Sequence, residues 1–298
     1  MNTEAMPLVK PRSFRLRHLL SRLWNLRTGV AGGLVVVVVC VMAVLAPVLA
    51  PYDPYDGEIL NRLRPPAWME RGSAEFLLGT DLLGRDYLSR IMHGARISLT
   101  VAALAVALSC TLGTLLGLLA GYFGHSVDWI ISAGLDVMMA FPFVLLALAV
   151  IAVVGPSLPN MIAVLGITGW PLYTRVVRAE VQRLKVLEFV LAARTLGASD
   201  VRIIVRHLFP NLLNALVVIV SLEVARMIIL EAFLSFLGLG VQPPTPSWGG
   251  MLGEARELMF DRWWMAAFPG MAIFVTTLAI NLFGDGLRYW FSPYSKNY

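Results

Sequence analysis

The chain has 298 residues, of which 58% are hydrophobic and only 14% are charged, and its formal net charge at pH 7 is +5. A soluble domain is roughly 45–50% apolar, so this composition excludes an ordinary soluble protein. Nucleic-acid binding is the other explanation of a basic chain, and the apolar composition gives it little weight. Cys40 and Cys110 both lie in apolar runs, where we interpret them as small hydrophobic residues.

Six mainly apolar runs of about twenty residues follow one another along the chain. About twenty helical residues cross a hydrocarbon core of roughly 30 Å. We therefore predict an all-α membrane protein with six transmembrane helices, at residues 29–49, 97–121, 131–154, 159–177, 212–238 and 266–284. The first run is uncharged and too long for a signal peptide, so we interpret it as a retained helix. The fourth run is the weakest, because Gly166, Gly169 and Pro171 interrupt it.

Lys and Arg concentrate in two connecting segments, 1–28 and about 178–210. Short segments rich in these residues stay on the cytoplasmic side. We therefore expect both termini to be cytoplasmic and the loops at about 50–96 and about 239–264 to be external. Within 1–28, apolar residues alternate with arginines at helical spacing, which predicts an amphipathic helix on the inner leaflet. The chain thus divides into a basic segment, 1–28, and a membrane domain, 29–298.

The external segment 79–93 predicts a helix that begins at Thr80 or Asp81. Its expected apolar face consists of Leu83, Tyr87, Leu88, Ile91 and Met92. Two interpretations remain open for this helix: it lies along the surface, or it contacts a second protein.

Two prolines and one acid stand out in the third and fourth runs. Pro142 and Pro171 are expected to kink their helices, as proline does in many membrane helices. Asp136 lies early in the third run, where we favour a capping or interfacial position over substrate binding.

Residues 188–211, EFVLAARTLGASDVRIIVRHLFPN, read as a helix broken by glycine. A first helix at about 179–196 would place on one face Val186, Phe189, Val190, Ala193 and Leu196. Gly197 ends it, because glycine adopts the left-handed conformation that other residues avoid. Ser199 then serves as N-cap, and Asp200 suits the positive end of a second helix. This second helix has an apolar face of Val201, Ile204, Val205 and Leu208, and Pro210 ends it before the fifth run.

The bend between these two helices is lined by small residues, Ala192, Ala193, Gly197 and Ala198. They would let the backbone of another protein come close. Arg202 and Arg206 lie on the other face of the second helix. The alternative is an amphipathic helix that rests on lipid headgroups, and the residues alone do not decide between the two.

The fifth run contains three charged residues, Glu223, Arg226 and Glu231. Charges at membrane depth are costly and face a cavity or a partner. Glu223 and Arg226 are three residues apart and share a helical face, so they can pair. Three roles remain open for the group: an internal structural pair, the lining of a pathway, or contact with a second subunit.

The loop at 188–211 resembles the cytoplasmic loop of permease subunits in ABC importers. That motif reads EAA, three residues, Gly, about nine residues, then I-x-L-P, and here the corresponding residues are Leu191-Ala192-Ala193, Gly197 and His207-Leu208-Phe209-Pro210. Leu191 stands where the motif has glutamate, and His207 and Phe209 also depart from it. These departures put a specific glutamate contact in doubt, and they leave the docking role in place.

Three further segments resemble the dipeptide, oligopeptide and nickel importer family. They are FLLGTDLLGRDYLSRIMHGARISL at 76–99, LSFLGLGVQPPTPSWGGMLGEAR at 234–256 and WWMAAFPGMAIFVTTLAINLFGDGLR at 263–288. The resemblance extends from about residue 29 to the C-terminus. Chain length and the short first external loop are similar to those of the C-type permease of the pair.

This resemblance implies a type I ABC importer permease fold in a bacterial inner membrane. The implied partners are a homologous B-type permease, two ATPase subunits and an extracytoplasmic substrate-binding protein. ATP and Mg would bind the ATPases, and this chain would bind no cofactor or metal. The implied coupling residues are Ala192, Ala193, Gly197, Ala198, Ser199, Asp200, Arg202 and Arg206. Glu223, Arg226, Glu231 and Asp136 are candidates for the pathway or a subunit contact.

Two other classes of protein remain as alternatives. A secondary transporter would work without an ATPase, but it usually shows internal repeats, and we find none that persuades. An intramembrane enzyme needs a nucleophile and base, or metal ligands, at one depth. The sequence contains no HExxH pair and no GxSxG elbow, and its four histidines fall at expected helix ends or in loops. It also lacks the G-x-x-x-x-G-K-[ST] phosphate loop, so we expect no ATP hydrolysis by this chain.

Overall fold

A computed structural model describes residues 12–291, and the side chains from residue 27 to residue 290. The regular structure of this part is helical: α1 (Arg12–Leu49), η1 (Ile59–Asn61), α2 (Tyr87–Phe123), α3 (His125–Ala140), α4 (Phe143–Val154), α5 (Leu158–Thr168), α6 (Trp170–Leu184), α7 (Glu188–Thr195), α8 (Asp200–Ile203), η2 (Ile204–Leu208), α9 (Phe209–Phe236), α10 (Trp248–Ala255) and α11 (Trp264–Phe291). Between residues 12 and 291 the β-pairing amounts to two isolated bridges. The predicted all-α fold is confirmed.

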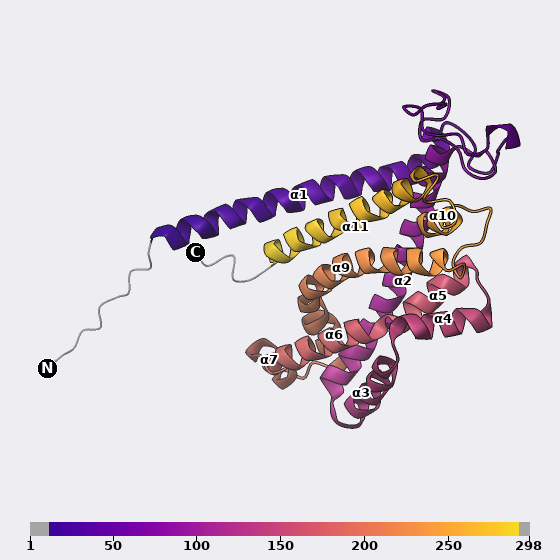
Figure 1. The fold of residues 1–298 in the computed structure, drawn as a ribbon. Coiled ribbons are helices and arrows are strands. Elements are labelled where there is room, and N and C mark those ends of the chain that lie inside the picture. The colour runs from indigo at the N-terminus through magenta and orange to yellow at the C-terminus, as the bar shows by residue number, and fades with distance from the viewer. Residues whose placement is uncertain (1–11, 292–298) are drawn as a thin grey trace.

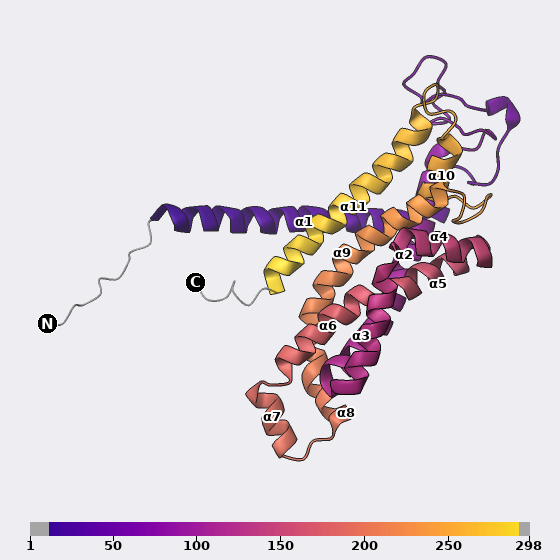
Figure 2. The same cartoon turned by 60° about the horizontal axis from the view of Figure 1, so that its bottom comes forward.

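The helices pack around α2, which contacts α1, α5, α6 and α9. The helices α1 and α11 lie side by side, and α9 runs along the other side of α11 (Figures 1 and 2). The short helix α10 joins α9 and α11 at one end of the bundle, and α7 lies at the opposite end (Figure 2).

Four stretches of the described chain are long and apolar enough to span a membrane: Arg27–Leu49, Tyr87–Phe123, Asp200–Phe236 and Trp264–Trp290. They match four of the six expected spans, of which the one expected at 212–238 ends at Phe236. The third expected span, 131–154, is divided into α3 and α4, which meet at 86°. Proline has no backbone N–H and disfavours helix at the preceding residue, so Pro142 places Phe141 in an extended conformation.

The fourth expected span, 159–177, is divided between α5 and α6 at Gly169. With 11 residues, α5 is shorter than the roughly twenty needed to cross a bilayer. The described part therefore contains four spanning helices, or five if the bent pair α3–α4 counts as one. The two remaining expected runs form broken helices packed on or beside α2.

A row of glycines brings α2 and α6 into close contact. Gly113, Gly117 and Gly121 are four residues apart and therefore share one face of α2. A Cβ atom at Gly117 would lie 2.7 Å from Cβ of Val177, and one at Gly121 would lie 2.7 Å from Cβ of Val181. Small residues at this spacing let membrane helices approach backbone to backbone.

The first external loop differs from the expected one. The helix α2 begins at Tyr87, where Asp86 caps it by accepting a hydrogen bond of 2.8 Å from the backbone N–H of Ser89. The predicted start at Thr80 or Asp81 is wrong, because both residues are buried in the loop. The loop therefore ends at residue 86 rather than near 96.

The amphipathic helix predicted within residues 1–28 can be compared with the structure only in its backbone from Arg12 onward. The backbone of α1 is one continuous helix from Arg12 to Leu49, so the amphipathic segment and the first span are not separate elements. The side chains of the predicted amphipathic face lie outside the described residues, as do residues 1–11 and 292–298.

Candidate coupling surface

The broken helix at 188–208 lies at the end of the bundle opposite α10 (Figure 2). The helix α7 ends before Gly197, whose φ of +80° is left-handed, as predicted. The backbone N–H of Ala198 donates 3.1 Å back to the carbonyl of Ala193, which closes the end of α7. Ser199 occupies the N-cap position of α8, but its side chain makes no capping hydrogen bond.

The two predicted helices have different boundaries in the structure. The helix α6 ends at Leu184, and α7 begins only at Glu188, so the predicted single helix at 179–196 is wrong. Pro210 does not end the second helix, because α8, η2 and α9 form one continuous helical rod. The π-helical turn η2 accommodates the proline: the backbone N–H of Phe209 donates to the carbonyl of Ile204, five residues back.

These boundaries rotate the buried face away from the predicted one. On α7, Val190 and Ala193 are buried, whereas Leu196 is 87% exposed. On the second helix, Ile203 and Leu208 are buried, and Val201 and Val205 are exposed. The predicted apolar faces therefore each divide into a buried part and an outward part. The outward part is an apolar surface that the described residues of the chain leave uncovered.

Eight exposed residues form the surface that we call the coupling surface: Ala192, Leu196, Gly197, Ser199, Val201, Arg202, Val205 and Arg206. A Cβ atom at Gly197 would meet nothing within 4 Å, so the bend is open to a partner. Of the other predicted coupling residues, Asp200 is exposed and accepts a hydrogen bond from Tyr122, Ala193 is buried and Ala198 is half-buried. The small size of the two alanines serves packing within the chain.

The coupling surface is attached to the end of α2 by polar contacts. The hydroxyl of Tyr122 donates to Oδ1 of Asp200 at 2.5 Å and accepts from Nη2 of Arg194 at 3.3 Å. The Arg194 guanidinium also lies over the Tyr122 ring, 5.6 Å from its centroid. Lys185 donates through Nζ to the carbonyl of Gly121 at 2.8 Å. One end of α2 therefore holds α7, α8 and the turn before α7.

An apolar core supports the same attachment. Val190 and Ile203 pack in one buried cluster with residues of α2, α6 and α9, including Leu118, Val181 and Leu212. Protein interiors are close-packed and transmit displacement rather than absorb it. A push on the coupling surface would therefore move the ends of α2, α6 and α9 together.

The charged residues of the fifth run do not gather at one site. Nη1 of Arg226 lies 3.3 Å from Oε1 of Glu223, the pairing that their spacing predicts. Glu223 is buried, and the Arg226 guanidinium lies over the ring of Phe143 in α4, 5.5 Å from its centroid. Glu231 is fully buried and accepts 2.7 Å from Ser235 on its own helix. Asp136 is exposed on α3.

A buried ionic cluster at the α10 end was not predicted. Asp81 accepts from Nε of Arg85 at 2.6 Å and also pairs with Arg90, and Nη2 of Arg90 donates to Oε1 of Glu254 at 2.9 Å. Arg90 is only 1% exposed. Burial raises the pKa of Glu254 to about 7; the charge of Asp81 adds to this shift and that of Arg85 opposes it. The cluster fastens α10 to the first turns of α2. The charges within GTDLLGRDYLSR are its sequence signal, but Glu254 lies far along the chain.

The described residues contain no group of three or more His, Cys, Asp or Glu side chains placed to hold a metal ion.

Comparison with known proteins places this arrangement in a family. Residues 113–296 match the model for a binding-protein-dependent transport system inner membrane component. Residues 16–66 match the N-terminal TM domain of oligopeptide transport permease C.

Relatives of known name align over almost the whole chain. The di/tripeptide transport system permease protein DppC of Pseudomonas aeruginosa is 44% identical over 270 residues, covering 90% of this chain and 89% of the relative. The glutathione transport system permease protein GsiD of Pectobacterium atrosepticum is 41% identical over 294 residues, covering 98% and 96%. A chain of the MetNI methionine ABC transporter, solved in inward-facing conformations, superposes with a TM-score of 0.56 at 17% identity. That superposition covers 68% of this chain and 96% of the other, and it shows the likeness of fold alone.

Proposed function

The chain belongs to the family of binding-protein-dependent transport system inner membrane components, and we propose that its coupling surface receives the movement of a partner ATPase. It is a multi-pass inner membrane permease subunit of an ATP-driven importer for peptides or related small solutes. One observation carries the coupling role: an exposed, apolar broken helix is hydrogen-bonded to α2 and packs on α2, α6 and α9.

The coupling surface has the composition of a docking site. An aliphatic centre at Leu196, Val201 and Val205 is flanked by Arg202 and Arg206, which suits an apolar groove with an acidic rim on the partner. Closure of two ATPases on ATP would displace this surface. Tyr122 and the core beneath would pass the displacement to α2, and the rod from α8 to α9 would pass it onward.

The remaining parts of the proposal concern the partners. ATP and Mg would bind two ATPase subunits, because this sequence has no phosphate loop. A homologous B-type permease would complete the pathway, and an extracytoplasmic binding protein would deliver cargo to the α10 end. The positive-inside rule supports this orientation, with both termini and the coupling surface in the cytoplasm. Arg226, half-exposed on α9, is our candidate for a pathway or subunit contact.

Replacing Leu196 with glutamate tests the docking role. The side chain is outward and touches no core, so the chain should insert and fold normally. A charge forced into a desolvated interface should act as a hot-spot loss of about 2 kcal/mol or more, roughly thirtyfold in affinity. We expect the ATPase to be lost from the purified complex and peptide uptake to fall with it.

The matched control is Leu60→Glu. Leu60 is 92% exposed in the first loop, at the other end of the molecule, so ATPase retention should be unchanged. Full ATPase association and uptake in the Leu196 variant would show that the surface has another role. If the purified chain alone carried peptide into liposomes without ATP, the secondary-transporter alternative would replace our proposal.

A further inference from the structure

The helical rod formed by α8, η2 and α9 joins the two ends of the molecule. It runs from Asp200 to Phe236, which is 37 residues, or about 55 Å at 1.5 Å per residue. Its first residues belong to the coupling surface, and its last turns lie against α10 (Figure 2). A movement of the coupling surface can therefore reach α10 through the contacts that the far end of the rod makes.

Glu231 lies in the last two turns of this rod and is fully buried. Its Oε1 accepts a hydrogen bond of 2.7 Å from the hydroxyl of Ser235, one turn further along. Its Oε2 has no hydrogen-bond partner within the described part of the chain. A buried polar atom without a partner is costly, so a carboxyl at this position needs a reason that an apolar side chain would not supply.

Two more serines approach the same carboxyl, and they come from two other helices. Ser98 lies on α2, Ser247 is the N-cap of α10, and both are buried. The Ser98 hydroxyl accepts 3.3 Å from the backbone N–H of Trp248, and the Ser247 hydroxyl accepts 3.1 Å from that of Gly250. A hydroxyl that accepts in this way still has its own proton to donate. The Glu231 carboxyl is thus the point at which polar groups of α2, α9 and α10 meet.

The start of α10 is also packed tightly between α9 and α2. A Cβ atom at Gly249 would lie 2.4 Å from Cα of Ala232 on α9. The Trp248 side chain is buried and donates through Nε1 to the carbonyl of Ile91 on α2 at 3.0 Å. Because close-packed groups transmit displacement, α9 cannot shift far without moving the start of α10 or breaking these contacts.

The two ends of α10 are held by different groups. Near its C-terminal end, Glu254 pairs with Arg90, which ties α10 to α2. At its N-terminal end, the Glu231 carboxyl brings in the rod as well. The loop 237–247 runs from the end of α9 to this N-terminal end of α10, so both ends of the loop are attached to the rod.

We propose that Glu231 is a positioning residue for transport. It ties the far end of the rod to α2 and α10, and so carries movement of the coupling surface to the loop 237–247. This inference rests on the coupling role proposed above. A purely structural role is the alternative. It would change the amount of folded complex without changing how much peptide is moved for each ATP hydrolysed.

The whole complex in proteoliposomes, supplied with binding protein, peptide and ATP, gives peptide uptake and ATP hydrolysis as separate measurements. Glu231→Met removes the carboxyl but fills the space with an unbranched apolar side chain. We expect this variant to assemble and to hydrolyse ATP, with the peptide moved per ATP lowered about tenfold, which corresponds to one lost buried hydrogen bond. Glu231→Gln keeps polar atoms at the same place and should keep most of the ratio.

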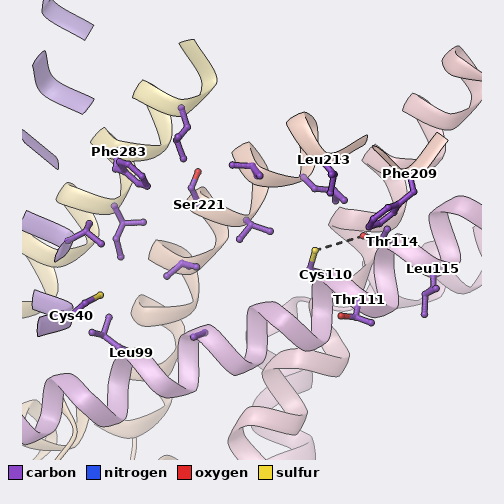
Figure 3. A pocket seen from close by; sticks show the side chains of 18 of the residues that line it. Cys40, Leu99, Cys110, Thr111, Thr114, Leu115, Phe209, Leu213, Ser221 and Phe283 are labelled. Atoms are coloured by element: carbon purple, nitrogen blue, oxygen red, sulfur yellow. Dashed lines mark hydrogen bonds between the residues drawn. The ribbon is translucent and has the colours of Figure 1, made fainter. Parts of the chain in front are cut away.

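A second variant removes only one hydroxyl. Ser98→Ala takes away the α2 side of the tie and should also lower the peptide moved per ATP. Its matched control is Ser221→Ala. Ser221 lies earlier on α9, in the apolar groove between α1, α2, α9 and α11 (Figure 3), and donates 2.8 Å to the carbonyl of Val218 on its own helix. The control should keep the ratio of the unaltered complex.

A ratio that is unchanged in both Glu231→Met and Ser98→Ala would overturn the proposal, and so would uptake and ATP hydrolysis that fall together. If Glu231→Met does not assemble, Ser98→Ala decides by itself. These results are distinct from those for ATPase docking. Loss of the ATPase in Leu196→Glu together with an unchanged ratio in Glu231→Met would leave the coupling surface in place and overturn the role of Glu231.

Discussion

Glu254 fastens α10 to α2 through Arg90, and its pKa of about 7 makes the stability of the protein depend on pH. The ordinary pKa of a glutamate is 4.5. Below about this pH, Glu254 is protonated in both the folded and the unfolded state, so folding does not bury a charged carboxylate and costs nothing on that account. Between that value and about 7, only the unfolded state has released its proton, so stability falls as pH rises. Above about 7 the carboxylate is ionised in both states, and the full penalty remains.

The size of the effect follows from the pKa. A rise of the pKa from 4.5 to about 7 lowers the free energy of unfolding by about 3 kcal/mol at high pH, since one pKa unit equals about 1.4 kcal/mol. The Glu254 side chain is 22% exposed, so solvent screening makes this figure an upper value. For a protein of this size, about 1 kcal/mol shifts the melting temperature by about 2–4 °C. We therefore expect the melting temperature to fall by up to about 10 °C between pH 5 and pH 8.

Thermal unfolding of the purified complex at a series of pH values measures this dependence. Glu254→Gln should remove most of the slope, because the amide stays neutral throughout. Glu257→Gln is the matched control: Glu257 is exposed just after α10, so its variant should keep the slope of the unaltered protein. A melting temperature that is flat over this range in the unaltered protein would refute the reasoning. It would mean that Arg85 and Arg90 keep Glu254 ionised at every pH tested.

Gly117→Leu should separate α2 from α6 and lower stability by about 3 kcal/mol or more, measured as a loss of folded complex, whereas Gly117→Ala should cost less. Normal yield of the leucine variant would contradict the close contact. A membrane-impermeant maleimide applied to intact cells should label Trp68→Cys and not Ser199→Cys, and labelling of the second would reverse the proposed orientation. Arg226→Leu should leave Glu223 buried and unpaired and reduce complex yield, and adding Glu223→Gln should restore it. Failure of this rescue would point to a contact with another subunit.

The sequence by itself determined the features that depend on neighbouring residues. Long apolar runs predict spanning helices because length and composition alone decide whether a helix can cross a bilayer. Gly197 marks the break in the coupling helix because its left-handed backbone is a property of one residue. Glu223 and Arg226 pair because three residues along a helix bring them to one face. The four-residue spacing of the α2 glycines is visible in the sequence, but the sequence does not show that α6 is the helix they contact.

The tertiary structure decided which part of each apolar pattern is buried. Val190 and Leu196 both suit a buried face, yet only Val190 packs on the core, because α7 ends at Thr195 and the chain turns away at Gly197. Pro210 signals a helix end, but the π-helical turn before it re-pairs the backbone and α9 continues. A local pattern fixes what a helix can bury, and the neighbours that it meets fix what it does bury.

The same limit applies to sites made from distant segments. Arg90 and Glu254 are 164 residues apart, and only the docking of α10 on α2 joins them. The apolar groove between α1, α2, α9 and α11 likewise exists only because four helices pack without filling the space between them. Such contacts depend on the relative placement of whole elements, and that placement minimises the energy of the entire fold rather than of any one segment.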